Sequence, residues 1–286
     1  MYWYIKKILR FILTRTSKIW PSKLYLKLLF ILSGGDYALD LDNPQTFNEH
    51  LNWNKLYDHN PLYHRLVDKY EVKGIVEDLI GKEYIVPCYG VWDNLNDIDY
   101  SSLPNKFVLK STHDSSGAFV CQNKDHLDLL AVRNHFKDFE MGNYWPAREW
   151  AYKGVKPRIL ADQLLDDDSG HELTDYKFWC FNGEPKVMYI TNKGEHVEEN
   201  FYDMEFKPLM IDHGFPRSIP EYEKPNDFEK MKELARILSK DMSFVRVDFF
   251  DIKGKIYFGE FTFYDWGGYM PFANYEMDKH LGNLWD

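Results

Sequence analysis

The sequence predicts a mixed α+β fold, in which helices come first and strands with interspersed helices make up the rest of the chain. Two patterns carry this prediction. Up to Gly81, apolar residues recur at the spacing of helices that bury one face. After Gly81, short apolar or alternating runs are separated by turn residues, which is typical of strands. The 286 residues, 44% of them hydrophobic and 17% aromatic, suffice for one large domain or two to three tightly packed lobes.

The helical part divides at residues that cap or break helices. Ser33-Gly34-Gly35 ends the first stretch, Thr46 can cap the next, Pro61 opens another, and Gly81 closes the last. We expect one or two helices within residues 3–33, and further helices at 46–56, 61–67 and about 70–79.

The second part alternates strands with two helices. We expect strand-like runs at residues 84–86, 90–92, 106–110, 118–121, 158–165, 175–181, 186–191, 244–250 and 255–262, and helices at 127–136 and 228–238. The Ser/Gly-rich residues 111–117 and the turn at 251–254 each predict a hairpin. Residues from about 193 to 226 are hydrophilic and predict no element.

Charge is distributed unevenly along the chain. The net charge is −10, yet residues 1–35 hold seven basic side chains and no acidic one. The remaining acidic body argues against nucleic-acid binding, which needs a basic field. The three cysteines show no paired or metal-binding spacing, so we expect reduced thiols and a cytoplasmic protein.

The basic N-terminal segment is also rich in apolar residues. On a helix, Lys6, Lys7 and Arg10 fall on one arc, and aromatic and aliphatic residues occupy the rest. Residues 1–20 therefore suit a helix lying on an anionic membrane at the inner face. A helix docked on the protein's own core is the alternative. The segment is too short in apolar residues to span a bilayer and lacks the pattern of a signal peptide.

Polar residues share one face of the last predicted hairpin. Arg246 and Asp248 have the same parity on one strand, and Glu260 and Thr262 have the same parity on the other. Carboxylates on an otherwise apolar strand pair are costly unless something binds them. Magnesium, which prefers carboxylate oxygens, is one candidate. A salt bridge from Arg246 to either carboxylate is the other.

Two further segments carry polar groups beside turns. Lys110 ends a strand and precedes the small-residue loop, so its ammonium and the loop N–H groups can surround phosphate, although this is not the P-loop order. We expect His113 in that loop to face solvent. Asp175 and Lys177 give a charged end to their strand. Residues 166–168 resemble the acidic triplet of sugar transferases, but a solvated turn beside Ser169-Gly170 is the simpler interpretation.

Taken in order, these segments resemble the ATP-grasp superfamily, and more closely its branch named for teichuronopeptide synthesis, which is found among genes for cell-surface and capsular polysaccharides. The segments that carry the resemblance are Asp68–Lys73 with Gly81 and Pro87, Phe107–Gly117, Arg158–Leu165, Asp175–Lys177, Arg246–Asp248 and Gly259–Thr262. The resemblance implies two α+β subdomains that grip ATP, at about 85–157 and 158–286 within a catalytic region 61–286, after a basic amphipathic helical segment 1–60.

The resemblance also implies roles for individual residues. Toward ATP it assigns phosphate contacts to Lys73, Lys110 and Lys177, the closing loop to Ser115, Ser116 and Gly117, the adenine contact to the strand of Asp162 and Leu164, and the ribose contact to Asp175. It assigns one or two Mg²⁺ ions to Asp248, Glu260 and Thr262. Arg246, Lys110 and Lys177 would be catalytic, with Arg246 stabilising an acyl phosphate and the tetrahedral intermediate.

The activity that the resemblance implies is ATP-dependent ligation of a carboxylate to an amine through an acyl phosphate. The carboxylate would belong to a uronic acid or another group of a surface glycan or sugar precursor, and the amine would be an amino acid or a simple amine. Two alternatives remain open at this point. One is a glycosyltransferase that uses a nucleotide sugar, and the other is a partner-binding module of this shape without catalysis. Trp145, Trp150, Tyr202 and Trp266 can stack on sugars, although packing is the simpler use.

Overall fold

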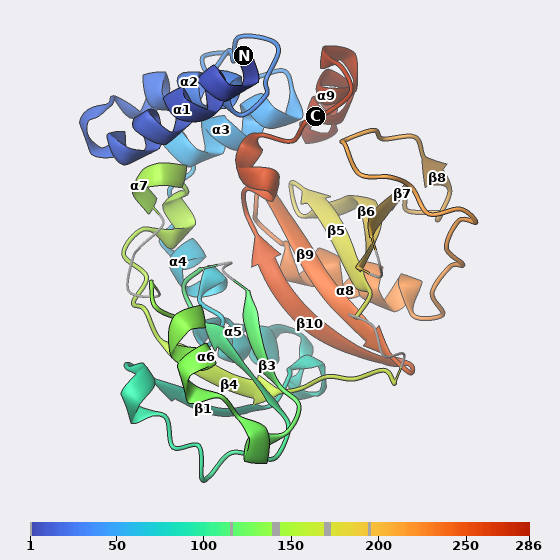
Figure 1. Cartoon of the computed structure of the whole chain (residues 1–286). Helices are drawn as coiled ribbons and strands as arrows, with labels where there is room; N and C mark the ends of the chain where they lie inside the picture. Colours follow the sequence, from blue (N-terminus) through green and yellow to red (C-terminus); the bar gives the residue numbers. More distant parts are fainter. Residues whose placement is uncertain (1, 115–116, 139–143, 169–172, 194–195) are drawn as a thin grey trace.

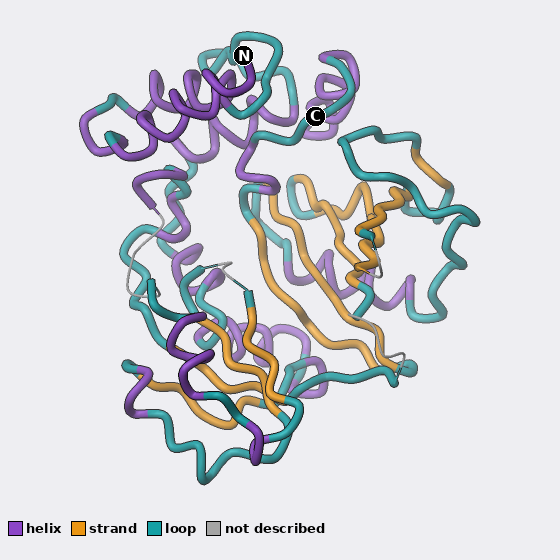
Figure 2. Tube along the Cα trace, viewed as in Figure 1, coloured by secondary structure: helices purple, strands orange, loops and turns teal. Residues whose placement is uncertain are grey.

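The computed structural model describes residues 2–114, 117–138, 144–168, 173–193 and 196–286. Figure 1 shows a helical end, formed by the N-terminal helices and the C-terminal helix, above two lobes that each contain a sheet. Figure 2 shows that strands run through both lobes and that helices flank them. The predicted α+β class is confirmed.

The helical end begins with three helices, α1 (Tyr2–Arg15), α2 (Ser22–Leu32) and α3 (Phe47–Tyr57). The predicted cap of α3 is present, because Thr46 accepts a hydrogen bond from the Glu49 N–H and the Glu49 carboxylate accepts one from the Thr46 N–H. The remaining helices are α4 (Leu62–Val67), α5 (Glu71–Ile80), α6 (Leu129–His135), α7 (Tyr144–Ala147), α8 (Phe228–Leu238) and α9 (Tyr275–Gly282). Short 3-10 helices lie at Ser17–Ile19, Lys82–Tyr84, Leu95–Asp97, Lys124–His126, Trp150–Tyr152, Asp265–Gly268 and Asn283–Trp285.

The first sheet has four antiparallel strands in the order β1 (Cys88–Trp92), β4 (Ile159–Gln163), β2 (Phe107–Ser111) and β3 (Ala118–Cys121). The predicted hairpin around the small-residue loop is β2–β3. Because β4 pairs with both β1 and β2, this sheet extends past the boundary expected near residue 158.

The second sheet has six antiparallel strands in the order β10 (Lys255–Thr262), β9 (Phe244–Ile252), β5 (Asp175–Phe181), β6 (Glu184–Lys193), β7 (Val197–Tyr202) and β8 (Pro208–Leu209). The prediction of no element in 193–226 was wrong for β7 and β8. The charged sequence hides β7, because Glu199 and Asn200 are buried against polar partners, Thr191 for the carboxylate and the Ser218 carbonyl for the amide.

Both faces of the second sheet are covered at its centre. On one face Phe178, Val245 and Val247 pack with α8, and on the other Phe47 of α3 packs against Trp179. Since strand side chains alternate, Lys177, Arg246 and Asp248 lie on the same face of the sheet as Trp179. The polar residues predicted from parity therefore do share one face.

Candidate functional site

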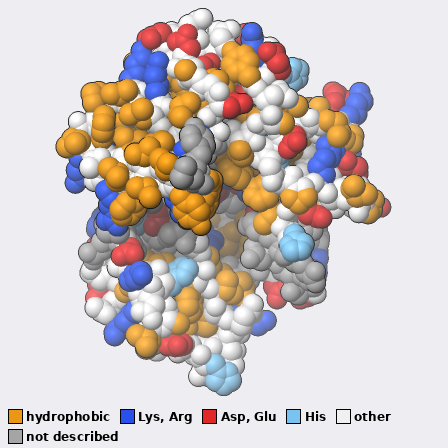
Figure 3. Space-filling view, turned by 45° about the horizontal axis from the view of Figure 1, so that its top comes forward, with side chains coloured by type: hydrophobic (Ala, Val, Ile, Leu, Met, Phe, Trp, Pro, Cys, Tyr) orange, Lys and Arg blue, Asp and Glu red, His pale blue; other side chains and the backbone are white. Residues whose placement is uncertain are grey.

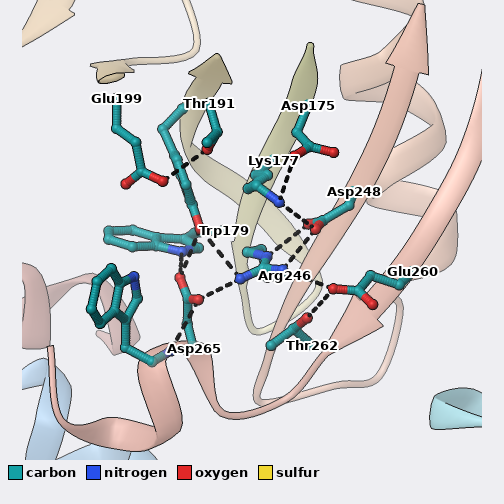
Figure 4. Close-up of polar contacts among 12 residues, drawn as sticks. Asp175, Lys177, Trp179, Thr191, Glu199, Arg246, Asp248, Glu260, Thr262 and Asp265 are labelled. Carbon is teal, nitrogen blue, oxygen red and sulfur yellow. Dashed lines mark hydrogen bonds and ion pairs between the residues drawn. The ribbon is translucent and has the colours of Figure 1, made fainter. Parts of the chain in front are cut away.

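Arg246 and Asp248 form the centre of a polar cluster on β9. The Arg246 guanidinium donates from Nε to Asp248 Oδ1 and from Nη2 to Asp248 Oδ2, each over 2.7 Å, so the contact is bidentate. Lys177 on the neighbouring strand β5 donates to Asp248 Oδ2 over 3.0 Å. Figure 4 shows Arg246 and Lys177 pointing from two neighbouring strands toward the Asp248 carboxylate.

The charge of Asp248 is maintained by these cations. Burial alone would raise its pKa, but Arg246 and Lys177 outweigh burial and lower the pKa below its ordinary value. Asp248 is only 3% exposed and is ionised at neutral pH. A buried carboxylate that is already ionised is ready to bind a cation, because no proton must leave first.

Glu260 extends the cluster on β10. Arg246 Nη2 donates to Glu260 Oε1 over 3.1 Å, and the Thr262 hydroxyl donates to the same oxygen over 3.3 Å. The strand pairing is shifted between Phe258 and Phe261, where Gly259 lies so close that an added Cβ would stand 3.1 Å from the Asp248 carbonyl. The irregularity brings the Glu260 side chain onto the face of Arg246 and Asp248.

Asp265, which was not predicted from the sequence, holds Arg246 from the other side. Asp265 has no exposed surface, and its carboxylate accepts hydrogen bonds from Trp179 Nε1 over 2.6 Å, from the Tyr189 hydroxyl over 3.1 Å and from Arg246. The available signal was an aspartate between Tyr264 and Trp266 directly after the hairpin. Asp265 and Asp248 together fix the plane of the guanidinium (Figure 4).

The donors of this cluster suit magnesium, although the described residues hold no group of three or more His, Cys, Asp or Glu side chains placed as metal ligands. In the structure the salt-bridge alternative is realised, since Arg246 contacts both carboxylates. The same contacts also show that one guanidinium nitrogen lies within 3.1 Å of both Asp248 and Glu260. Glu260 keeps 40% of its side chain exposed, so a cation can reach the carboxylate oxygens that Mg²⁺ prefers.

A second polar cluster, in which positive charges outnumber negative ones, lies on the four-stranded sheet. Lys73 of α5 and Lys110 of β2 both form ion pairs with Asp162 of β4, over 3.0 and 3.2 Å. Asp162 is 2% exposed, whereas the Lys110 side chain is 30% exposed. The two lysines implied for phosphate binding therefore lie together, with an excess of one positive charge. Asp162, expected beside adenine, is the counter-ion that joins them, and half-buried Leu164 follows the end of β4.

The loop after β2 folds inward at its start. His113 is 3% exposed, so the expectation of a solvent-facing histidine was wrong. Its Nδ1 lies 2.8 Å from the Ser111 hydroxyl, and the backbone of Thr112 bonds to Arg158 and Lys69, which draws the loop against two other segments. Ser115 and Ser116 lie outside the described residues. Gly117 has φ +95°, and a side chain there would meet open space.

Lys69 joins the two clusters. Its ammonium donates to the carbonyl of Asp114 in the loop, and its charge interacts with Glu260 of one cluster and Lys110 of the other. Burial lowers the pKa of Lys69, and Glu260 and Asp114 oppose this shift. No role for Lys69 was predicted from the sequence. The preceding Asp68 orients it, because this carboxylate caps α5 and pairs with Arg158 over 2.8 Å.

The other singled-out residues divide into two groups. Asp175 is buried, and its Oδ2 lies 3.5 Å from Lys177 Nζ, so it belongs to the edge of the Arg246 cluster. Residues 166–168 form an exposed turn in which Asp168 pairs with Lys253, as the simpler interpretation expects. Of the aromatic residues, Tyr202 is buried against Glu221 and Trp150 stacks on His59, which is packing. Trp145 and Trp266 are about two-fifths exposed.

Comparison with protein families matches residues 49–285 to the family described as TupA-like ATPgrasp. Comparison with curated proteins gives no match. Among solved structures, D-alanine–D-alanine ligase from Bacillus anthracis with ATP has a TM-score of 0.42 at 13% identity, covering 69% of this chain and 53% of the ligase.

Two further solved structures have similar scores. The D-alanine–D-alanine ligase from Helicobacter pylori has a TM-score of 0.43 at 16% identity, covering 77% of this chain and 61% of the ligase. N5-carboxyaminoimidazole synthase from Aspergillus clavatus with ADP has a TM-score of 0.39 at 13% identity, covering 70% of this chain and 44% of that one. This chain thus spans roughly half of each of these proteins.

Proposed function

The chain belongs to the TupA-like ATP-grasp family, and on this premise we propose that it is an ATP-dependent carboxylate–amine ligase that forms an amide. The observation that carries the proposal is the half-buried Lys69, whose charge acts both on Lys110 of the net-positive cluster around Asp162 and on Glu260 of the Arg246–Asp248–Glu260 cluster. A triphosphate needs cations at several oxygens and carboxylates for its metal, and these two clusters supply both.

The residues have distinct tasks in this proposal. Mg²⁺·ATP supplies the γ-phosphoryl group that activates the acceptor carboxylate. Lys73, Lys110 and Lys177 neutralise the phosphate oxygens, and Asp248, Glu260 and Thr262 hold the metal. Arg246, whose pKa is raised above its ordinary value against the effect of burial, stays charged and stabilises the oxyanion when the amine attacks. Adenine would lie along β4 near Asp162 and Leu164, with Asp175 toward the ribose.

The acceptor carboxylate is proposed to belong to a uronic acid or a similar group of a surface polysaccharide or its precursor. The family resemblance supports this choice, and so does the surface of α1. Its outward residues are unusually apolar, with Tyr4, Ile8 and Phe11 each more than half exposed. No helix among the described residues has the length and apolar character needed to cross a bilayer. A helix lying on an anionic membrane would place the enzyme beside lipid-linked glycans.

The proposal is tested by the ATP chemistry of Asp248→Asn. The purified wild-type chain should convert ATP to ADP and phosphate only with Mg²⁺, and faster when glucuronic acid and an amino acid mixture are present. Asp248→Asn should reduce this rate by at least about 100-fold, because the ligand charge is lost and Arg246 keeps only one of its two oxygen partners on this residue.

The matched control is Asp241→Asn. Asp241 is exposed and has φ +63°, a conformation that asparagine adopts readily, so its rate should equal that of the wild type. A protein that binds a uridine diphosphate sugar but shows no Mg²⁺-dependent ATP turnover would overturn the ligase proposal in favour of sugar transfer.

A further inference from the structure

A cavity of about 320 Å³ lies beside the helical end, against helices α1 and α2. Its lining comes from segments far apart in the sequence, including Arg10 and Thr14 of α1, Leu29 of α2, Glu149, Tyr152 and Tyr269. Figure 1 shows α7, which precedes Glu149, between the N-terminal helices and the lower lobe, and Figure 3 shows a recess on this side of the molecule. The volume suits a small molecule and is too small for a glycan chain.

The cavity adjoins the proposed reaction centre through two residues. Asp114 lines the cavity and also accepts the hydrogen bond from Lys69. Tyr152 lines it as well, and the charges of Glu260, Glu149 and Arg246 all act on its phenol, whose pKa is raised mainly by burial. A molecule in the cavity would therefore lie near the carboxylate of the acceptor substrate, which is proposed to react beside Arg246 and Glu260.

Glu149 is one of two acidic residues that line the cavity; the other, Asp114, has its carboxylate 3.8 Å from His113. The Glu149 carboxylate forms no hydrogen bond and no ion pair within 4 Å with any residue that the structure describes. Lys55 is its nearest electrostatic partner, but the Lys55 ammonium donates instead to the Gly267 carbonyl over 2.6 Å. Glu149 Oε1 lies 3.4 Å from the position where a side chain on Gly267 would begin. The glycine thus leaves space beside an ionisable, half-buried carboxylate.

Arg10 supplies the opposite charge at the mouth of the cavity. It is exposed on α1, and its charge acts on the phenols of Tyr25 and Tyr269, which places it on the face that α1 turns toward the protein. A cation at the mouth, an anion inside and the apolar Leu29 and Pro146 between them complement a zwitterion with a small side chain.

We infer that this cavity binds an α-amino acid as the amine substrate, with its ammonium on Glu149 and its carboxylate on Arg10. The inference rests on the proposed ligase function and adds the class of the amine. Before attack, the ammonium passes one proton to the Glu149 carboxylate. The neutral nitrogen then forms the C–N bond, the bond from the acyl carbon to phosphate oxygen breaks, and the second proton leaves with phosphate.

The charge of Glu149 supports this proton transfer. Burial raises the pKa of its carboxyl above the ordinary value, and Lys55 opposes the shift. A carboxylate whose pKa lies above that of a free glutamate accepts a proton from an ammonium more readily. Apolar walls and Tyr152 would keep bulk water from competing for the activated acyl group.

Calorimetric titration with the twenty standard amino acids tests the inference without any acceptor. The full chain is first saturated with Mg²⁺ and the non-hydrolysable ATP analogue AMP-PNP. At least one amino acid should then bind, and Glu149→Gln should weaken it by more than about tenfold. Arg10→Gln should weaken the amino acid similarly but leave its decarboxylated amine unchanged. The control Glu77→Gln, on the exposed side of α5, should bind as the wild type does.

The outcomes separate the two proposals. If AMP-PNP binds but none of the twenty amino acids does, the cavity assignment is overturned and the ligase proposal stands. If AMP-PNP itself does not bind, both proposals are overturned. Amino acid binding that survives both Glu149→Gln and Thr14→Trp places the amine elsewhere and overturns the assignment. Thr14 is half-exposed on α1, and Thr14→Trp should fill the cavity from that helix. This variant replaces Glu149→Gln as the test of the cavity if circular dichroism shows that Glu149→Gln fails to fold. Stronger binding of glucuronate by Glu149→Gln would assign the cavity to the acid and overturn the inference.

Discussion

At the scale of single residues, the ion pair between Lys177 and Asp248 makes stability depend on pH. The side chains are 12% and 4% exposed, so the pair is little screened by water. The pKa of Asp248 is lowered, so its contribution is present above the ordinary value of 3.8 and is lost as the pH falls through the depressed value. The pKa of Lys177 is raised, so its contribution is present below 10.5 and is lost as the pH rises past the raised value.

Lys177→Met should therefore lower the free energy of unfolding by about 3 kcal/mol between roughly pH 5 and pH 9. The difference from wild type should shrink on both sides of this range, and urea unfolding at a series of pH values measures it. Lys230→Met, at an exposed surface pair, should change stability by less than about 0.5 kcal/mol at every pH. A difference that stays constant below pH 4 would contradict this account of Asp248.

The residues that sequence reasoning missed share a physical cause. Asp265 reaches Trp179 across 86 positions, and Lys55 reaches the Gly267 carbonyl across 212. Local periodicity shows which residues share a strand face, so it could predict Arg246 with Asp248. It cannot show which distant buried group neutralises them. His113 was misplaced for the same reason, because the bonds that draw its loop inward come from Lys69 and Arg158.

At the scale of elements, two helical glycines have opposite consequences. Gly74 lies within α5, and a Cβ there would have no neighbour within 4 Å. Gly282 ends α9, where a Cβ would stand 2.1 Å from the Gln45 carbonyl just before α3. The contact between α9 and α3 therefore requires glycine at 282, whereas α5 would gain from alanine at 74.

Gly74→Ala should raise the free energy of unfolding by about 0.5–1 kcal/mol, because alanine loses less backbone entropy in a helix. Gly282→Ala should lower it by about 2 kcal/mol or more, because backbone must move apart. Each variant is the control for the other, and both are measured by urea denaturation. Equal effects of the two substitutions would show that helix propensity alone determines the change in the free energy of unfolding. That result would contradict a requirement for glycine at the contact between α9 and α3.

The elements themselves were largely predictable from the sequence. Capping and breaking residues such as Thr46 and Gly81 gave the helices, and both hairpins followed from turns between alternating runs. The exceptions are β7, β8, α7 and α9. In β7, Glu199 is buried because Thr191 donates to it over 2.9 Å and His213 contacts its other oxygen. A charged strand is invisible to hydrophobic patterning when its partners come from other parts of the chain.

At the scale of the whole molecule, nucleotide binding should couple the two sheets. Lys110 belongs to the first sheet and Asp248 to the second, so a nucleotide–metal complex that contacts both stabilises only the assembled state. Mg²⁺·AMP-PNP at about 100 times its Kd should stabilise the fold by about 2.7 kcal/mol and raise Tm by roughly 5 °C.

Removal of the metal with EDTA should cancel most of this rise in Tm, as measured by differential scanning fluorimetry. Lys110→Met should reduce the rise in Tm that Mg²⁺·AMP-PNP causes, and it should not change the Tm measured with Mg²⁺ alone. The same rise with AMP-PNP in EDTA would contradict a metal held by Asp248 and Glu260. Lys106→Met, on an exposed lysine that precedes β2, is the matched control and should respond as the wild type does.

The outer surface of the helical end leads to the last prediction. The inward arc of α1 carries Arg10 and the buried Leu13, and its outward arc carries Ile5, Ile8 and Ile12, each about half exposed. The docked alternative is therefore confirmed, and attachment of the apolar outward face to a membrane stays a prediction. Figure 3 shows hydrophobic side chains gathered at this end of the molecule. Exposed Lys7, Arg15 and Lys18 border the face and would attract anionic lipid.

Replacing Ile5, Ile8 and Ile12 together with glutamate should weaken binding to vesicles that contain phosphatidylglycerol by roughly 100-fold, because apolar burial is lost and repulsion is added. Flotation measures the bound fraction. Since these side chains are already exposed, the fold should keep its Tm. Leu79→Glu with Ile237→Glu, two exposed apolar residues elsewhere, should float as the wild type does. Equal recovery of all three proteins, or equal binding to phosphatidylcholine vesicles alone, would leave α1 as a packing element whose inward arc closes the cavity.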